Sequence, residues 1–497
     1  MKLNNIKAVF RGSSGDSFFL IFIRVVTLVL GLLMTRILSG RFSLQDYGTY
    51  SQVMLISSTV SSFTILGLMD GINFFFCKET DDKKRNDYVS TIFFVQYVAS
   101  TIAALTVIAC TIPISRYFDN PNLKGLLIFA AVLPVLHNSI SLLQIMFIAI
   151  GKAKIIAFRN LIVSVLKLLF ITIACYVFDS IVVLLLFQVI LEITQVAYFV
   201  FTLRKNNYTI NIFRFDKTLI KEILLYCIPM AMFSVIKSIN RDSDKYIISF
   251  FTDTETLAIY TNASKLLPFD IVMISFCTVL LPYITRYISQ KKYNQAQSLY
   301  IAFLELSYKI TTILAMGAVC VAPELFTFLY TEKYLANGFG VTVFIIYIIV
   351  DIFSVLNLTM VLSAAGKTKT IMFVSLGTLS ANILLNIGLF FAFCEIGPAV
   401  ATLVVTLIQG FIIFSLTSKE LKTKPYKMLS WKNFFIFLIQ LAVVSAICIK
   451  LRSVMLSFKI PYFIVMMSVY CLFCGTLLLA NIRRLKNTIT EINKSRI

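Results

Sequence analysis

The chain has 497 residues, of which 59% are hydrophobic, and its mean hydropathy is +0.88. Soluble domains hold roughly 45–50% apolar residues, and the excess here is spread along the whole chain, which excludes a soluble protein and a soluble domain on one anchor. The net charge is +21, from 45 Lys and Arg against 24 Asp and Glu. The basic residues lie in short loops between apolar runs, so the charge does not indicate nucleic-acid binding.

The apolar runs are continuous rather than alternating and are long enough to cross a bilayer as helices. This pattern predicts an all-α polytopic membrane protein with about fourteen transmembrane helices. In chain order we expect them near residues 17–38, 49–76, 89–113, 124–150, 156–177, 180–203, 222–250, 256–286, 298–322, 339–365, 371–394, 396–417, 432–451 and 460–482.

Basic residues concentrate in every second loop, together with the two ends of the chain. Representative groups are Lys83 to Arg85, Lys152 and Lys154, Lys291 and Lys292, Lys367 and Lys369, and Arg483 and Arg484. Cytoplasmic loops carry an excess of Lys and Arg. We therefore expect a multi-pass protein of the bacterial plasma membrane with both termini in the cytoplasm.

A short segment recurs at a fixed offset. AIGKAKIIAF at 149–158 and AAGKTKTIMF at 364–373 share six of ten residues and follow the fourth and the tenth expected helix. The alternative is a shared loop type, in which Gly ends a helix and Lys marks the cytoplasmic side. A duplication predicts three parts: 1–205 with six helices, 206–418 with six helices, and 419–497 with the last two helices and a cytoplasmic tail.

Several cationic residues lie inside the expected helices. A charge at the bilayer centre costs roughly 2.5–3.5 kcal/mol on insertion scales, so such residues normally face a cavity or a partner. Arg24 shares one helix face with Thr27, Gly31 and Thr35, which predicts that it points away from lipid. The other cations are Lys167, Lys237, Arg241 and Lys265. If these faces converge, they line a positive cavity that suits an anionic cargo.

Acidic residues inside the expected helices are candidates for other tasks. Glu192, Asp351 and Asp70 are candidates for coupling transport to an ion gradient. Glu305 and Lys309 have the i,i+4 spacing with the acid first, which predicts an intrahelical pair. The alternative for Lys237 and Arg241 is an exposed helix end with local pairing.

Sequence motifs for chemistry are missing. The chain has no G-x-x-x-x-G-K-[ST] phosphate loop, and its one histidine, His137, lies in an apolar run. Cys471 and Cys474 form a C-x-x-C inside the last expected helix, where small buried side chains are the simpler interpretation. We therefore expect no catalytic residue, no metal and no cofactor, and a protein that is not an enzyme.

Local patterns resemble the polysaccharide flippases (Wzx-type O-antigen translocases) of the multidrug/oligosaccharidyl-lipid/polysaccharide (MOP) exporter superfamily. LSGRFSLQDYGTY at 38–50 is similar to the Y-G-x-Y segment that follows the first helix in that family. DKYII at 244–248, AIY at 258–260 and ASKL at 263–266 resemble its D-[KR]…G-x-Y-x-x-A-x-K-L run, with Ala258 in place of the usual glycine. The resemblance covers essentially the whole chain.

The resemblance implies a MATE-like MOP fold of two six-helix lobes plus two C-terminal helices. It also implies translocation of an undecaprenyl-pyrophosphate-linked glycan to the outer leaflet, for O-antigen, capsule or exopolysaccharide synthesis. Membrane lipid is then a partner, and a polysaccharide polymerase and chain-length machinery are candidate partners. Arg24 matches a basic residue that related lipid II flippases use in their first helix. Two rivals remain: an ion-coupled small-molecule exporter of the same superfamily, and an integral-membrane polysaccharide polymerase.

Overall fold

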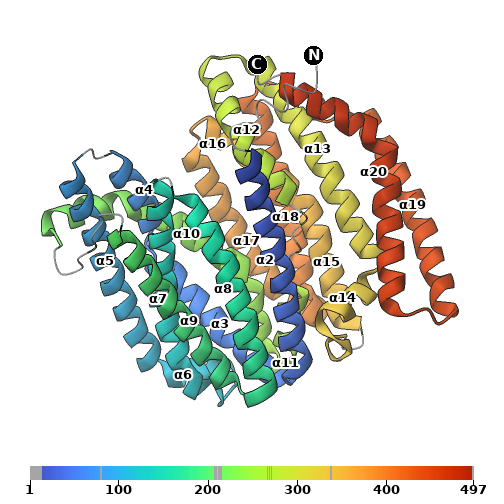
Figure 1. Ribbon diagram of the computed structural model, residues 1–497. Helices are drawn as coiled ribbons and strands as arrows, with labels where there is room; N and C mark the ends of the chain where they lie inside the picture. Colours follow the sequence, from blue (N-terminus) through green and yellow to red (C-terminus); the bar gives the residue numbers. More distant parts are fainter. Residues whose placement is uncertain are drawn as a thin grey trace. The chain divides into compact units, whose positions relative to one another are not determined.

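The computed structural model describes residues 14–78, 81–150, 152–205, 210, 215–265, 267, 269, 271–335 and 338–494. Throughout these ranges the regular secondary structure is helical (Figure 1). The described part of each segment expected to cross the membrane is mainly helical, in one helix or in two or three consecutive helices. The expectation of an all-α protein is confirmed.

By its internal contacts the chain forms two compact units. Unit 1 comprises Met1–Ile239 and Asp253–Ala258, and unit 2 comprises Asn240–Thr252 and Ile259–Ile497. The long helix α10 (Lys217–Phe251) therefore begins in unit 1 and ends in unit 2, and α11 (Thr254–Ala263) is also shared. The division into 1–205, 206–418 and 419–497 stays a prediction.

Unit 1 is built from helices that pack through one apolar core. The core contains Leu68, Phe75, Phe93, Phe147 and Phe199, all nearly inaccessible to solvent. The helices are α2 (Ser14–Arg41), α3 (Leu44–Thr64), α4 (Leu68–Lys78), α5 (Asp82–Ala109), α6 (Thr111–Tyr117), α7 (Leu123–Ala149), α8 (Ala153–Ile173) with the π-helical turn η1 (Ala174–Phe178), and α9 (Ile181–Lys205).

Two apolar cores lie among the described residues of unit 2. Tyr300 and Phe303 lie in the first, and Phe437 and Phe473 lie in the second, where the last two helices pack on α13. The helices are α12 (Ile271–Ser289), α13 (Tyr293–Cys320), α14 (Ala322–Tyr330), η3 (Glu332–Tyr334), α15 (Phe339–Ser354), η5 (Val355–Asn357), α16 (Met360–Ala364), α17 (Thr368–Phe393), η6 (Cys394–Ile396), α18 (Gly397–Glu420), η7 (Pro425–Met428), α19 (Trp431–Ser457) and α20 (Tyr462–Lys494).

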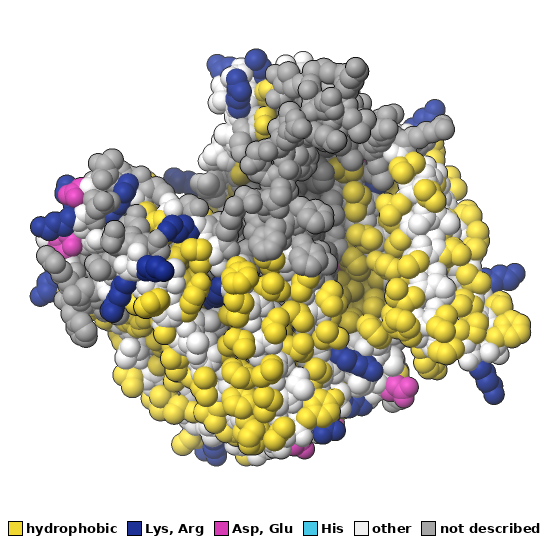
Figure 2. All heavy atoms as spheres, in the orientation of Figure 1, with side chains coloured by type: hydrophobic (Ala, Val, Ile, Leu, Met, Phe, Trp, Pro, Cys, Tyr) yellow, Lys and Arg dark blue, Asp and Glu magenta, His cyan; other side chains and the backbone are white. Residues whose placement is uncertain are grey.

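The outward faces of many helices are apolar, which makes this a multi-pass membrane protein. Figure 2 shows hydrophobic side chains over the helix flanks and Lys and Arg near helix ends. Among the described residues, nine helical segments are long and apolar enough to cross a membrane, or ten with the bent pair α3–α4. One of the nine, Thr368–Glu420, contains both α17 and α18. A single helix of that length would be about 80 Å long, far more than a bilayer core, so it represents two crossings. The count of fourteen stays a prediction.

The repeated segment adopts the same local geometry at both positions. The Lys152 amide donates to the Phe147 carbonyl and the Lys367 amide to the Leu362 carbonyl, each at 2.9 Å. Each lysine precedes the first residue of a helix, α8 or α17. The same type of cap closes α12, where Lys292 donates to Tyr287 at 2.8 Å. Loop geometry alone therefore does not distinguish a duplication from a common helix cap, and the sequence match carries that argument.

Gly48, in the segment that resembles the family's Y-G-x-Y pattern, allows a close approach of two backbones. A Cβ at Gly48 would lie 2.1 Å from the carbonyl oxygen of Thr254, at the start of α11. Close by, the Gln52 amide donates to the Thr254 hydroxyl at 3.4 Å. The glycine therefore joins α3 to α11 within unit 1.

We expect Gly48→Ala to lower the stability of the protein, because the added methyl group cannot fit without moving the backbone of α3 or α11. Overpacking of this kind costs about 1–3 kcal/mol. The measurement is the melting temperature of the detergent-solubilised protein. Gly125→Ala is the matched control, since a Cβ there meets nothing within 4 Å. Equal melting temperatures for the two variants would contradict this account.

Candidate functional site

Each unit contains a cluster of charged side chains, and the two clusters differ in how far their side chains are exposed to solvent. The side chain of Arg24 lies outside the described residues, so its predicted role stays a prediction. The other seven predicted site residues are described. Lys167, Glu192, Asp70 and Lys237 lie in unit 1, and Arg241, Lys265 and Asp351 lie in unit 2.

The cluster of unit 1 lies between α8 and α9. Lys167 and Arg159 are two turns apart on α8, and both act electrostatically on the Glu192 carboxylate of α9. Arg159 is only 7% exposed and donates to the Asn160 side chain at 2.6 Å and to the Gln195 side chain. Its guanidinium also lies 4.7 Å from the centre of the Phe199 ring. These contacts replace part of the water that a buried cation would otherwise need, and they leave the Arg159 Nε without a hydrogen-bond partner.

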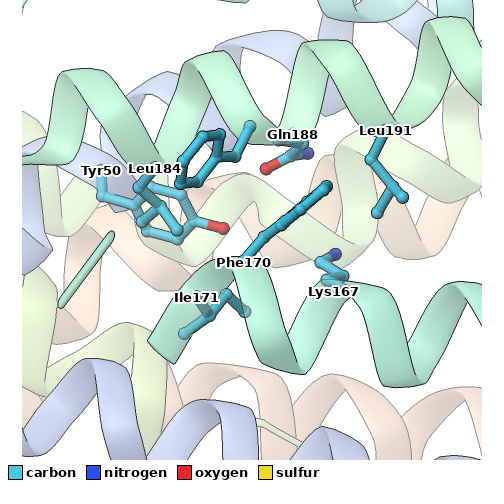
Figure 3. A pocket seen from close by; sticks show the side chains of 8 residues that line it. Tyr50, Lys167, Phe170, Ile171, Leu184, Gln188 and Leu191 are labelled. Carbon is cyan, nitrogen blue, oxygen red and sulfur yellow. The ribbon is translucent and has the colours of Figure 1, made fainter. Parts of the chain in front are cut away.

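Lys167 lines a small cavity of about 10 Å³ (Figure 3). Its amine, the Tyr50 hydroxyl and the Gln188 amide are the polar groups there, among apolar side chains such as Phe170 and Leu184. A cavity of this volume has room for about one water molecule. Lys167 and Glu192, predicted to bind cargo and to couple an ion respectively, thus belong to one cluster, and the cavity beside Lys167 is too small for a phosphate group in this conformation.

The cluster of unit 2 lies at the end of α10. Asp242 accepts from Arg241 at 2.8 Å and from Lys245 at 2.7 Å. Lys245 in turn acts electrostatically on Lys265, which donates to the Asn262 side chain at 2.7 Å. Lys245 therefore lies near both Arg241 and Lys265, two residues that the sequence analysis selected from different helices.

Accessibility separates the cations of this cluster from its acids. The Arg241 side chain is 61% exposed and Lys265 is also exposed, whereas Asp242 and Asp244 are 5% and 1% exposed. The Asp244 carboxylate accepts from the Tyr347 hydroxyl and from the Lys245 amide, the latter at 2.9 Å. The acids are enclosed by protein donors, so the accessible charge of this cluster is positive.

Two side-chain amides of α17 donate hydrogen bonds to residues 240–243 of α10. Asn382 donates to the Asn240 carbonyl at 3.2 Å and to the Ser243 hydroxyl at 3.1 Å, and Asn386 donates to Ser243 at 3.2 Å. Both amides are nearly inaccessible to solvent. The segment of α10 that carries Arg241 is therefore hydrogen-bonded to α15 through Asp244 and to α17 through Asn240 and Ser243.

The remaining predicted residues do not join either cluster. Lys237 is exposed on α10. Asp70 lies in the first turn of α4, half-buried near Tyr226 and Cys227. Asp351 is 2% exposed on α15. Their predicted tasks stay predictions.

Two ion pairs with a buried partner stabilise unit 2 away from this cluster, in addition to the more exposed pair of Lys367 and Glu420. The predicted pair of Glu305 and Lys309 is confirmed, with Lys309 wholly buried. The second pair, Glu324 with Arg452, was not predicted because its partners are 128 positions apart in the sequence. Within the described ranges, no three His, Cys, Asp or Glu side chains lie close enough together to hold a metal ion.

The sequence analysis missed three charged residues of the clusters. Arg159 lies eight positions before Lys167, which places both on one face of a helix, and this spacing was a usable signal. Asp242 and Lys245 adjoin Arg241 and Asp244 in the sequence, but which of these groups is exposed depends on the helices that pack against α10.

We expect Glu192→Gln to lower the melting temperature of the purified protein, because Lys167 and Arg159 then lose the one carboxylate that acts on both. Loss of a partner for a buried charge costs about 1–3 kcal/mol. Glu192→Gln/Lys167→Met removes one cation together with the acid and should recover part of the loss. Glu255→Gln, at an exposed carboxylate in the first turn of α11, is the control. A double variant no more stable than the single one would contradict the coupling.

In unit 2 we expect Tyr347→Phe to destabilise the protein, because Asp244 is buried and loses a hydroxyl donor. Hydrogen bonds to charged groups contribute about 1.5–3 kcal/mol. Thermal unfolding in detergent measures the effect, and Tyr426→Phe, at a tyrosine that is 53% exposed, is the control. Adding Asp244→Asn to Tyr347→Phe should bring the unfolding temperature closer to that of the wild type, because the buried group is then neutral. Unchanged unfolding of Tyr347→Phe would exclude the contact as a stabilising one.

Comparison with solved structures shows the fold. The lipid II flippase MurJ in an inward closed conformation is similar with a TM-score of 0.73 and 16% identity, over 94% of this chain and 100% of that chain. An inward-facing multidrug resistance MATE family transporter of the MOP superfamily gives 0.59 and 11% identity, over 80% and 94%. A MOP superfamily transporter from Pyrococcus furiosus, described as having reverse polarity of its binding pocket, gives 0.55 and 13% identity, over 82% and 94%. The predicted MOP fold is thereby confirmed.

Sequence comparison gives the family. No curated protein matches this chain. A family model described as "Polysaccharide biosynthesis protein" matches residues 33–337, which is more than half of the chain and includes α3 to α14. The multi-pass architecture and the MOP fold agree with this match, and the protein belongs to the polysaccharide biosynthesis protein family.

Proposed function

We propose that the protein is a flippase that moves undecaprenyl-pyrophosphate-linked oligosaccharide repeat units from the cytoplasmic to the outer leaflet of the plasma membrane. The observation that carries the proposal is the accessible positive charge at the end of α10, where Arg241 and Lys265 are exposed and Asp242 and Asp244 are buried. Pyrophosphate is an anion, and exposed guanidinium and ammonium groups are its usual protein ligands.

The mechanism follows from the cost of moving an anion across lipid. Outside water, a charged head group must exchange its hydration shell for protein donors. In the proposal Arg241, Lys265 and Arg24 supply those donors, while the apolar tail stays in the bilayer. Lys237, which lies on the same helix as Arg241, attracts the head group. The two lobes alternate between inward- and outward-open states.

The cluster of Lys167, Arg159 and Glu192 has a different place in the proposal. Its cavity is too small for the head group, so Lys167 binds cargo only in a conformation that separates α8 from α9. In the conformation described here it balances Glu192. We assign ion coupling first to Glu192, since two cations act on it, and after it to Asp351 and Asp70.

The localisation and the partners of the protein belong to the same proposal. The basic loops place both termini in the cytoplasm. A polymerase with its chain-length machinery would use the glycan once it reaches the outer face. The rival exporter of cationic compounds would need exposed carboxylates beside Arg241, and the two acids there, Asp242 and Asp244, are buried. A polymerase would need a chemical step, and we assign none to this chain.

The test measures on which side of the membrane the lipid-linked oligosaccharide lies. Spheroplasts of a strain lacking the protein are labelled at the outer-leaflet glycan, and the label is compared with the total. We expect the intermediate to stay unlabelled in the null strain and to become labelled when the wild-type gene is restored. Arg241→Ala/Lys265→Ala should reduce the outer-leaflet fraction about tenfold, which corresponds to about 1.4 kcal/mol of lost stabilisation. Arg24→Ala is measured beside it.

Two further variants make this test specific for charge. Arg241→Lys/Lys265→Arg keeps both cations and should retain most activity, and Lys124→Ala removes a lysine at the start of α7 and should change nothing. Full labelling in the null strain would mean that translocation proceeds without this protein. A polymerase would then be the better hypothesis for its function. Full activity of Arg241→Ala/Lys265→Ala would exclude the cation role.

A further inference from the structure

A second cavity lies in unit 2, remote from the end of α10 in the sequence. It encloses about 580 Å³ and is lined by α14, by η3 and by the end of α19 with its turn into α20. Small-molecule sites usually have volumes of about 300–1,000 Å³. Nothing in the proposed transport mechanism uses this cavity.

An ion pair between Glu324 and Arg452 forms part of the cavity wall. Glu324 on α14 is 4% exposed, and Arg452 on α19 donates to both of its carboxylate oxygens, from Nε at 2.8 and 3.0 Å. Beside it the rings of Phe328 and Phe463 lie 5.6 Å apart and join α14 to α20. The three helices are therefore fixed to one another, so the cavity is part of the packed structure of the unit.

The rim of the cavity carries groups of both signs. Glu332 and Lys459 are exposed there, and among the described residues no ion pair involves either of them. Thr327 contributes a hydroxyl, and Tyr462 is 59% exposed. With Glu324 and Arg452 paired below, the lining has no net charge. Glu332 would repel a pyrophosphate, and the charged groups of the lining are unfavourable for a lipid tail.

The chemistry of this lining suits a neutral ligand rich in hydroxyl groups. A carboxylate accepts hydrogen bonds from sugar hydroxyls, an ammonium donates to them, and an exposed tyrosine ring packs against the apolar face of a sugar ring while its hydroxyl stays wet. A saccharide uses all of these groups at once.

The position of the cavity agrees with this ligand. Figure 1 shows α14 and the turn between α19 and α20 at the same end of their unit, and α20 runs from that turn toward the opposite end. The segments that line the cavity follow the ninth and the thirteenth expected crossings, which the distribution of Lys and Arg places on the outer side. A translocated glycan emerges on that side.

We propose that this cavity is an outer-face subsite for the saccharide part of the cargo. Tyr462 provides the stacking surface, and Glu332, Lys459 and Thr327 provide the hydrogen bonds. The Glu324–Arg452 pair positions α14 against α19 and does not itself need to touch the sugar. The inference rests on the proposed function, because it takes the glycan from that function.

The experiment measures binding to the whole protein in lipid nanodiscs. The probe is the host's repeat-unit oligosaccharide, released from its lipid by mild acid, and the readout is saturation-transfer NMR with titration. We expect wild-type protein to bind it and Tyr462→Ala and Glu332→Gln each to weaken binding at least fivefold. The matched controls are Tyr426→Ala, at a similarly exposed tyrosine outside the cavity, and Glu255→Gln, at an exposed carboxylate of α11.

The same variants are then placed in the sidedness assay, which separates the two proposals. Wild-type binding that Tyr462→Ala and Glu332→Gln weaken, with both controls unchanged, supports the subsite. Translocation by a wild-type protein that binds no oligosaccharide overturns the subsite and leaves the flippase function intact. Equal binding by wild type and both cavity variants also overturns it, because the glycan is then held elsewhere. Normal translocation in the null strain overturns the proposed flippase function, and it overturns the subsite as well because the subsite rests on that function.

Discussion

The cost of placing charge in a low-dielectric medium controls how this molecule is built. A cation or carboxylate at membrane depth must have protein partners or reach water. Buried Lys309 has Glu305, buried Glu324 has Arg452, and buried Asp242 has Arg241 and Lys245. The pair of Glu324 and Arg452 also joins two helices, α14 and α19, whereas the other pairs are local contacts within one helix.

The same constraint explains why the two charge clusters differ. Between α8 and α9 the cations and the acid lie together, and two guanidinium nitrogens of Arg159 donate to amide oxygens while the group lies near the Phe199 ring. At the end of α10 the acids are enclosed while Arg241 remains exposed. A cluster of partnered, partly buried charges stabilises its own unit, whereas an exposed cation is available to a ligand. That asymmetry directs the functional proposal to the end of α10.

Close helix contact positions these groups. Gly48 lets the α3 backbone reach Thr254, and α17 amides bind the segment of α10 that carries Arg241. The proposed saccharide subsite uses the same principle, because the pair of Glu324 and Arg452 fixes α14 to α19 and so shapes a cavity from segments that are far apart in the chain. A single-pass or loosely packed bundle could not hold side chains in such fixed relations.

The amino-acid sequence was sufficient to predict the all-helical membrane class, the positions of the helices, and the pairing of Glu305 with Lys309. Each of these depends on local periodicity or on i,i+4 spacing, which a single helix expresses without partners. It also determined which helices contain cations. Which cations are accessible depends on tertiary packing, since exposure is set by the neighbouring helices: Lys167 lies in a small cavity between α8 and α9, whereas the Arg241 side chain is 61% exposed beside the buried Asp242 and Asp244.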